Sequence, residues 1–171
     1  FIRNCANYGS IYCSGLKLVI TAGGIIAQIS TFSSYVRIEN SLNYGTISGV
    51  TEEKSSSNLG GIAGNAQSVT ITNCVSAGKI ISNNSTSGGT YIGSIIGHMS
   101  FDLKAKTIYH CYWTSDVGNY NRCGYGTYFF DNETSQISLN TTTAKNLNTF
   151  ATSNGWNKWL LNADNRSITF N

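Results

Sequence analysis

The sequence predicts an all-β protein, a right-handed parallel β-solenoid (β-helix) of about three to four coils with a short α+β C-terminal cap. Three observations lead to this fold class. Two short blocks recur along the chain in the same order, apolar and polar residues alternate between the turns, and the 171 residues include no proline. A proline would remove a backbone donor that every inner coil needs. We expect the solenoid over residues 1–130 and the capping segment over residues 131–171.

The first block is an Ile-x-Asn-Cys pattern that opens each unit. Its isoleucines are Ile2, Ile38, Ile71 and Ile108. The residue three places after each isoleucine is Cys5, Ser41, Cys74 or Cys111. Matched positions of a solenoid lie one above another, so we expect the isoleucines to form an interior ladder and the Cys/Ser position to form a column.

The second block is a glycine-rich segment, seen at residues 23–27, at 60–64 and more weakly at 92–97. We interpret it as a third strand of each unit, in which missing side chains allow close backbone approach. The other two strands of a unit are typified by residues 68–72, which alternate polar and apolar, and residues 78–82. The block's Ile25, Ile62 and Ile95 predict a second interior ladder, and the fourth unit lacks the block. An antiparallel sandwich would explain the strands but not the repeat.

The segments between the blocks differ among the units. Residues 48–57 and 82–89 are polar and should protrude into solvent. The equivalent residues 16–20 of the first unit are apolar and would need cover.

The last 41 residues follow another pattern. Ala144, Leu147, Phe150 and Ala151 fall on one helical face, which Thr142 or Thr143 could cap and Gly155 could end. Tryptophans and a strand-like segment at 167–170 follow. We expect this segment to hide the open edge of the last coil.

The composition excludes several classes of protein. Charged residues make up 11% of the chain, and its net charge is +3. The sequence contains no stripe of basic residues of the kind that binds nucleic acid. No apolar stretch is long enough to cross a membrane. The chain contains 20 Asn, 22 Ser, 18 Thr and 18 Gly residues, all of which have low helix propensity. This composition argues against a helix bundle.

The two blocks resemble the GLUG-type repeats of bacterial and protist cell-surface proteins. The resemblance lies in Asn-Cys-x-Asn-x-Gly-x-Ile followed by Gly-Gly-Ile-x-Gly, and it covers about residues 1–117. It implies parallel β-helical pieces of large secreted or surface-attached proteins, often adhesin-like. The family offers no catalytic residues to carry over.

Three sets of residues could carry chemistry. Cys111 and Cys123 bracket a polar loop that a disulfide could close, although buried cysteines also serve as small apolar residues. Exposed aromatic residues could stack on glycans or else pack in the core; these are Tyr112, Trp113, Tyr120 and Tyr125. Sequons for N-glycosylation occur at Asn83, Asn84, Asn132, Asn140 and Asn165, all in expected loops or turns.

Nothing in the sequence predicts an active site, a metal site or a cofactor. The acidic residues fall in different loops, whereas acid–base chemistry on sugars needs clustered carboxylates. We therefore expect a non-catalytic extracellular or cell-surface module with a structural and adhesive role, as part of a longer surface protein or as a fibre-forming subunit. Its partners would be neighbouring repeats or protomers at the solenoid end, or cell-surface glycans. The alternatives are a lectin-like module and, third, a polysaccharide-acting β-helix enzyme.

Overall fold

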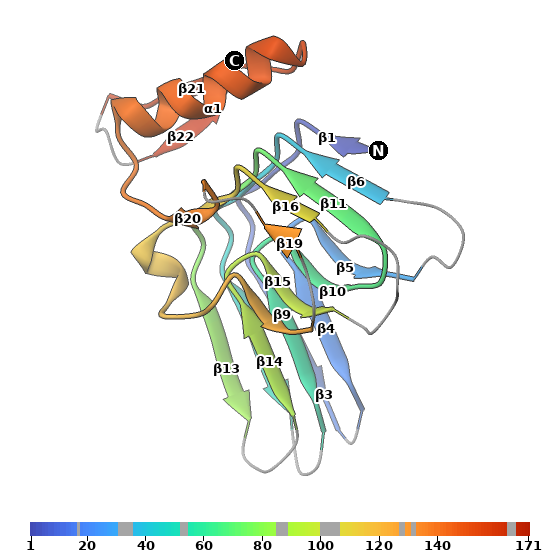
Figure 1. Ribbon diagram of the computed structural model, residues 1–171. Coiled ribbons are helices and arrows are strands. Elements are labelled where there is room, and N and C mark those ends of the chain that lie inside the picture. The colour runs from blue at the N-terminus through green and yellow to red at the C-terminus, as the bar shows by residue number, and fades with distance from the viewer. Residues whose placement is uncertain are drawn as a thin grey trace.

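The computed structural model describes residues 1–16, 18–30, 36–51, 55–84, 89–99, 107–126, 129–130, 133–163 and 167–171. These residues wind into a parallel β-solenoid, in which each sheet takes one strand from successive coils (Figure 1). A helix and an antiparallel hairpin follow the stack. The predicted fold class, a parallel solenoid with a C-terminal α+β segment, is confirmed.

The first three coils contain the same five strands. The first coil holds β1 (Ile2–Arg3), β2 (Ala6–Asn7), β3 (Ile11–Gly15), β4 (Ile20–Gly23) and β5 (Ile26–Ile29). The second holds β6 (Val36–Glu39), β7 (Leu42–Asn43), β8 (Ile47–Thr51), β9 (Ser57–Gly60) and β10 (Ala63–Ala66). The third holds β11 (Val69–Thr72), β12 (Val75–Ser76), β13 (Ile80–Asn84), β14 (Thr90–Gly93) and β15 (Ile96–Met99).

The fourth coil is shorter. It contains β16 (Thr107–Tyr109), β17 (Tyr112–Trp113), the 3-10 helix η1 (Ser115–Val117) and β18 (Cys123–Tyr125), and the chain then adds β19 (Phe129–Phe130) and β20 (Ser135–Gln136). The resulting sheets run in the orders β1-β6-β11-β16-β19, β2-β7-β12-β17-β20, β18-β15-β10-β5, β13-β8-β3 and β14-β9-β4. In the described chain, the last two sheets therefore stop at the third coil.

The two predicted isoleucine ladders are present. Ile38 pairs in register with Ile2 on one side and Ile71 on the other, and Ile71 pairs with Ile108. In the second ladder the Ile25 amide donates to the Ile62 carbonyl, and the Ile62 amide donates to the Ile95 carbonyl. Except at the first coil these side chains are fully buried, so the stack buries a continuous apolar core.

Each coil turns sharply at the residue before the Cys/Ser position. Asn4, Asn40, Asn73 and His110 occupy this corner, with φ values of 56°, 48°, 54° and 47°. Asparagine tolerates this left-handed conformation better than most residues with a side chain. The Asn amides also bond to one another along the stack: Asn73 Nδ2 donates to Asn40 Oδ1 at 2.7 Å, and Asn40 Nδ2 donates to Asn4 Oδ1 at 2.8 Å.

The glycine-rich block forms a corner and not a strand, which corrects one prediction. Gly60 ends β9, Gly61 and Ile62 make the bend, and Ala63 begins β10. A Cβ at Gly61 would overlap the Ser94 carbonyl oxygen of the next coil and the Ser76 hydroxyl. The glycine is thus needed for clearance at the bend.

The fourth unit does contain an equivalent of this block, contrary to prediction. Cys123 pairs with Ile96, and Tyr125 pairs with His98, so Gly124 lies above Gly97. A Cβ at Gly124 would lie 2.5 Å from the Gly97 carbonyl oxygen. The single glycine that the ladder needs is kept, while the recognisable Gly-Gly-Ile pattern is lost.

The C-terminal segment contains the predicted helix and terminal strand. Helix α1 (Thr141–Ser153) begins after Asn140, whose side chain accepts a hydrogen bond from the Thr143 amide; Asn140 is therefore the N-cap, in place of Thr142 or Thr143. Gly155, with φ of 65°, follows the helix end as predicted. Strands β21 (Trp159–Leu161) and β22 (Ile168–Phe170) form the hairpin.

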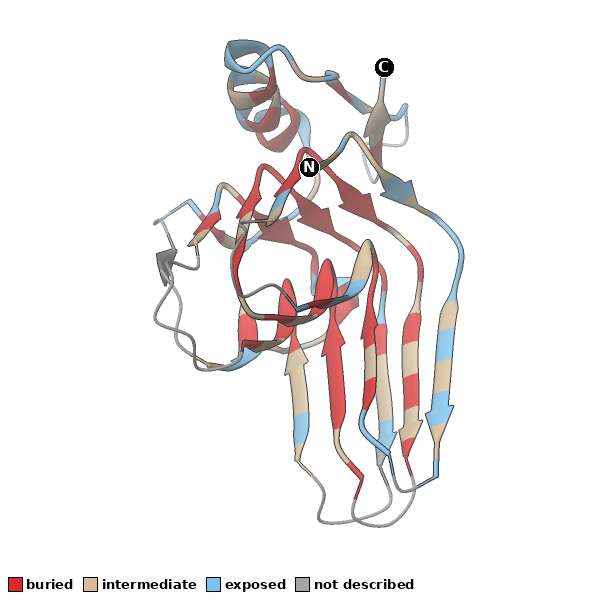
Figure 2. Ribbon diagram, turned by 90° about the vertical axis from the view of Figure 1, so that its right-hand side faces the viewer, coloured by how far each residue is buried: buried red, intermediate tan, exposed pale blue. Residues whose placement is uncertain are grey.

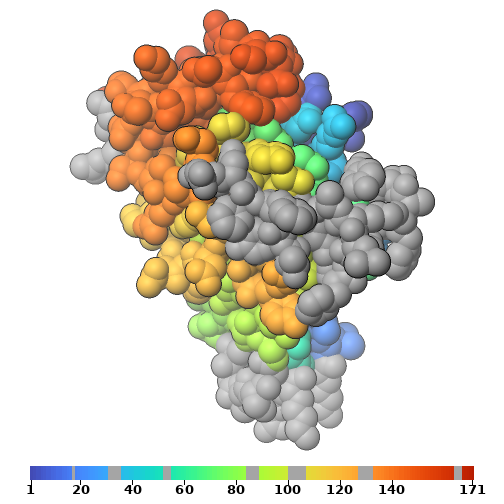
Figure 3. Space-filling view, in the orientation of Figure 1, coloured from blue at the N-terminus to red at the C-terminus, as the bar shows by residue number. Residues whose placement is uncertain are grey.

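The helix and hairpin of this segment lie along the side of the stack (Figures 1 and 3). The segment meets the last coil through β20, which pairs with β17, so the predicted cover of that edge comes from β20 and not from the helix. Leu147 and Trp159 pack in one cluster with Leu42, Val75 and Tyr112, which belong to three successive coils. Farther along, Asn157 bonds to Asn4 of the first coil. The segment covers the β2-β7-β12-β17 face because the outward side chains of that sheet are apolar.

Candidate functional site

The predicted Cys/Ser column is present at the left-handed corners. Backbone bonds place Cys5, Ser41, Cys74 and Cys111 in successive coils, each carbonyl accepting from the coil next to it. Every one of these side chains donates to the carbonyl two residues earlier, as in Ser41 Oγ to Glu39 O at 2.9 Å and Cys74 Sγ to Thr72 O at 3.3 Å. The column is a corner-stabilising position that either residue type can fill.

The structure does not join Cys111 and Cys123, and none of the five cysteines forms a disulfide. Cys111 Sγ donates to the carbonyls of Ile71 and Tyr109, and Cys123 Sγ donates to the Tyr125 carbonyl. The two thiols thus serve different corners of the coil, both inside the apolar core.

The four aromatic residues considered for glycan stacking divide into two groups. Tyr112 and Trp113 are only 4% and 7% exposed and pack inside the two apolar clusters. Tyr120 is half-buried against the core, and its hydroxyl donates to the Ile80 carbonyl. Tyr125 is 41% exposed and stacks on His98, with ring centroids 5.4 Å apart. Only Tyr125 offers a ring to solvent.

The sequons are placed as follows. Asn83 is exposed on β13 and Asn84 ends that strand, so these two lie in a strand and not in a loop. Asn140 is exposed, although its Oδ1 caps α1. Asn132 and Asn165 lie outside the described residues.

Across the described ranges, no three His, Cys, Asp or Glu side chains gather in a way that could hold a metal ion. No helix in the same ranges is long and apolar enough to span a membrane. The acidic residue Glu39 is buried and paired with Arg3, whose Nε donates to it at 2.8 Å.

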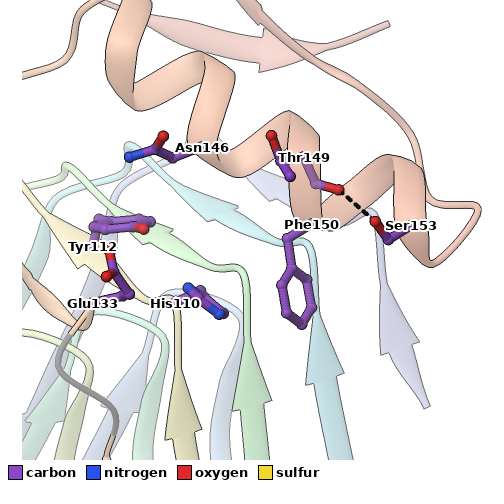
Figure 4. Close-up of a pocket in the computed structure, with 7 residues that line it drawn as sticks. All are labelled: His110, Tyr112, Glu133, Asn146, Thr149, Phe150 and Ser153. Carbon is purple, nitrogen blue, oxygen red and sulfur yellow. Dashed lines mark hydrogen bonds between the residues drawn. The ribbon is translucent and has the colours of Figure 1, made fainter.

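A groove lies between α1 and the fourth coil, and has a volume of about 550 Å³ (Figure 4). The helix contributes Asn146, Thr149, Phe150 and Ser153, and the opposite wall contains His110, Tyr112 and Glu133. His110 is held at the groove because it occupies the left-handed corner of the fourth coil, with its ring 4.7 Å from that of Phe150.

The polar groups of this groove are largely available to a ligand. Thr149 Oγ1 and Ser153 Oγ donate to helix carbonyls, which leaves their lone pairs as acceptors. The side chains of Asn146 and Glu133 have no hydrogen-bond partner among the described residues. The groove is therefore lined by an amide, a carboxylate, two hydroxyl oxygens and aromatic rings, with rings on both walls.

Of the residues that line the groove, only Tyr112 was predicted from the sequence to contact a ligand. The lining residues come from the fourth unit, the segment after it and the helix, and no local motif connects them. Only the loss of the corner asparagine at His110 marks the place in the sequence.

Comparisons with known proteins found no match: no family model, no curated protein and no solved structure is similar to this chain. The resemblance to GLUG-type repeats therefore stays a prediction.

Proposed function

We propose that the chain is a non-catalytic structural module of an extracellular or cell-surface protein, of the GLUG-type repeat kind, with an adhesive or spacer role. The observation that carries this proposal is the repetition of the same small and polar residue types at matched corners of successive coils. Residues kept at every coil serve the stack as a whole. A catalytic centre would instead require an unusual cluster at one place.

The low charge and the abundance of Asn, Ser, Thr and Gly support the extracellular assignment. The experiment that tests it is limited proteolysis of intact source cells, followed by mass spectrometry of the released peptides and of the purified protein. We expect release of the module by protease outside the cell, and a mass that includes sugar on Asn83 or Asn140. Recovery of an unmodified protein only after cell lysis would overturn the proposal.

A second candidate function is binding of neutral carbohydrate in the groove beside α1. Pyranose rings present C–H groups that suit aromatic faces and hydroxyls that suit amide and carboxylate groups. Phe150 and His110 supply the rings, and Asn146 and Glu133 supply polar groups that have no other partner among the described residues. The volume of the groove lies within the range of ordinary ligand sites, about 300–1,000 Å³.

Nuclear magnetic resonance with cellotriose, mannotriose and chitotriose tests this candidate. We expect saturation transfer to one of these sugars that is lost in Asn146→Ala and reduced in Glu133→Gln. Thr152→Ala, an exposed position on the same helix but not in this groove, is the matched control. Equal transfer to all variants would exclude the groove.

A further inference from the structure

The end of the stack at the first coil is an open surface. Strands β1 to β5 are all edge strands of their sheets, and all belong to this coil. Its inward positions are only half-buried: Ile2, Ile11 and Ile26 are partly exposed, whereas their partners one coil on are fully buried. In Figure 2 the outermost strand, β3, alternates exposed and intermediate residues beside a strand that is largely buried.

Six large apolar side chains of this coil are exposed. Between 60% and 85% of the following side chains is exposed: Phe1, Tyr8, Tyr12, Leu16, Leu18 and Val19. These residues follow the path from β1 through β3 to the start of β4. Beyond β4, at β5, the exposed residues are Ala27 and Gln28. The apolar surface therefore covers the β1–β3 side of the end and not the β5 side.

The surroundings of Gly9 indicate which kind of structure can pack against the β1–β3 side. A Cβ at Gly45 would overlap the Gly9 carbonyl of the coil below, and a Cβ at Gly78 would overlap the Gly45 carbonyl. Glycine is required at both places because a neighbouring carbonyl leaves no room. At Gly9 itself a Cβ would meet only Asn7 Oδ1 at 3.7 Å, and its φ is not in the left-handed range. Within the described chain, nothing requires glycine at this position.

Ala27 is the contrasting position. Gly64 lies above Ala27, and a Cβ at Gly64 would lie 2.6 Å from the carbonyl oxygens of both Ala22 and Ala27. The first coil carries an alanine where the later coils carry glycine, and that alanine is exposed. The first coil has thus lost the glycine on the β5 side, where a coil below would clash with it, and has kept the glycine on the β1–β3 side.

The ladder of asparagine side chains beside Gly9 also lacks a hydrogen bond at the first coil. Asn7 Nδ2 donates upward to Asn43 Oδ1 at 2.9 Å, while Asn7 Oδ1 accepts only from the Gly9 amide. A coil below with asparagine at the matched position would donate to Asn7 Oδ1 in the same way. Tyr8 stacks on Tyr44 with an interplanar angle of 9°, and its ring is 60% exposed.

We propose that the β1–β3 side of the first coil docks a further parallel β-coil of the same Asn-x-Gly type, whose carbonyl lies against Gly9 and which leaves the β5 side uncovered. The inference rests on the proposed structural role. A second copy of this chain does not fit, because the edge strands at its other end stop at different coils. In the described chain the β13 and β14 sheets stop at the third coil, whereas β19 and β20 extend two other sheets beyond the fourth, and Tyr120 bonds to Ile80 on β13.

The test is to supply such a coil by placing a duplicate of residues 36–69 before Phe1, which puts the duplicate in register with β1. The register also brings residues 63–66 of the duplicate below β5, where we expect the Ala27 side chain to prevent close pairing. We expect the extended protein to melt at least about 5 °C higher than the chain itself. Gly9→Ala should leave the melting temperature of the chain unchanged or slightly raised, and should lower that of the extended protein. Gly45→Ala, the matched control, should lower both.

Ala27→Gly should act in the opposite sense, raising the melting temperature of the extended protein and lowering that of the chain. The proposal is overturned if Gly9→Ala is equally harmless in both proteins, or if the extension adds no stability. Sedimentation of the chain as a dimer that Tyr12→Ser and Leu18→Ser disrupt would identify a second copy as the occupant and would also overturn it. None of these results would contradict the proposed structural role, which is tested separately by proteolysis of intact cells.

Discussion

Asn40 is the position where a single substitution should damage the stack most. Its side chain is fully buried and its φ is 48°. Nδ2 donates to Asn4 Oδ1 and to the Asn157 carbonyl at 2.9 Å, and Oδ1 accepts from Asn73 Nδ2 and from Trp159 Nε1 at 2.6 Å. The amide therefore joins three coils to the C-terminal segment.

Asn40→Ala should lower the free energy of unfolding by about 3–6 kcal/mol. Trp159 is 1% exposed, so its indole N–H would be left without a partner, which costs about 1–3 kcal/mol. The remaining bonds lead to groups that keep another partner or reach water, and together contribute about 1–2 kcal/mol. Alanine in the left-handed conformation adds about 1 kcal/mol. The total is a large part of the stability of an ordinary domain, about 5–15 kcal/mol.

Urea unfolding, followed by circular dichroism and by tryptophan fluorescence, measures this loss. Asn40→Gly separates the two causes, because it removes the bonds but accepts the backbone conformation; we expect it to be about 1 kcal/mol less harmful than alanine. In a Trp159→Phe background, Asn40→Ala should cost about 1–2 kcal/mol less, since no indole N–H is stranded. A loss below about 1 kcal/mol for Asn40→Ala, or no coupling to Trp159, would refute the reasoning.

The other predictions concern single positions of the same ladders. His110→Asn should raise the urea midpoint by the equivalent of about 1 kcal/mol, because the buried Asn73 Oδ1 has no partner and an asparagine above it could donate; an unchanged or lower midpoint would contradict this. Cys74→Ser should change the free energy of unfolding by less than about 1 kcal/mol, as Ser41 makes the same bond, whereas Cys74→Ala should lose about 1–2 kcal/mol; equal losses would be the contrary result. Asn140→Ala should cost about 1 kcal/mol and speed amide exchange in the first turn of α1, while Asn140→Ser should restore both.

The sequence was sufficient to predict the coils because stacking applies the same constraint at every turn. Ile38 and Ile71 meet at matched positions only if the backbone ladder repeats, so the recurrence of isoleucine reports the register directly. The helix was also predictable, since Ala144, Leu147 and Ala151 lie on its buried face. The predicted N-cap, Thr142 or Thr143, lies two or three residues from the observed one, because a run of Thr follows Asn140 and both Asn and Thr can cap a helix.

The division of the first three coils into five strands each could not be predicted from alternation. The corner at Gly61 interrupts the strands without a polar residue, because Ile62 still packs in the core. Across the corner at Asn40 both Ile38 and Leu42 are buried, although in different apolar clusters. The repeated asparagine did hold the signal, since it recurs where a left-handed residue is needed. The groove beside α1 has no such signal in the sequence, because its walls are brought together by tertiary packing alone.

The place where the C-terminal segment attaches follows from the chemistry of those corners. A corner amide carries two N–H groups, and the ladder uses only one of them. Asn40 and Asn73 are buried, so water does not reach the second donor, and each must find a protein acceptor. Asn40 finds the Asn157 carbonyl and Asn73 finds the Leu147 carbonyl at 3.2 Å, both on the C-terminal segment. The residue that allows each coil to turn therefore also bonds the helix and hairpin to the side of the stack, beside the apolar side chains of Leu42 and Val75 that pack against them.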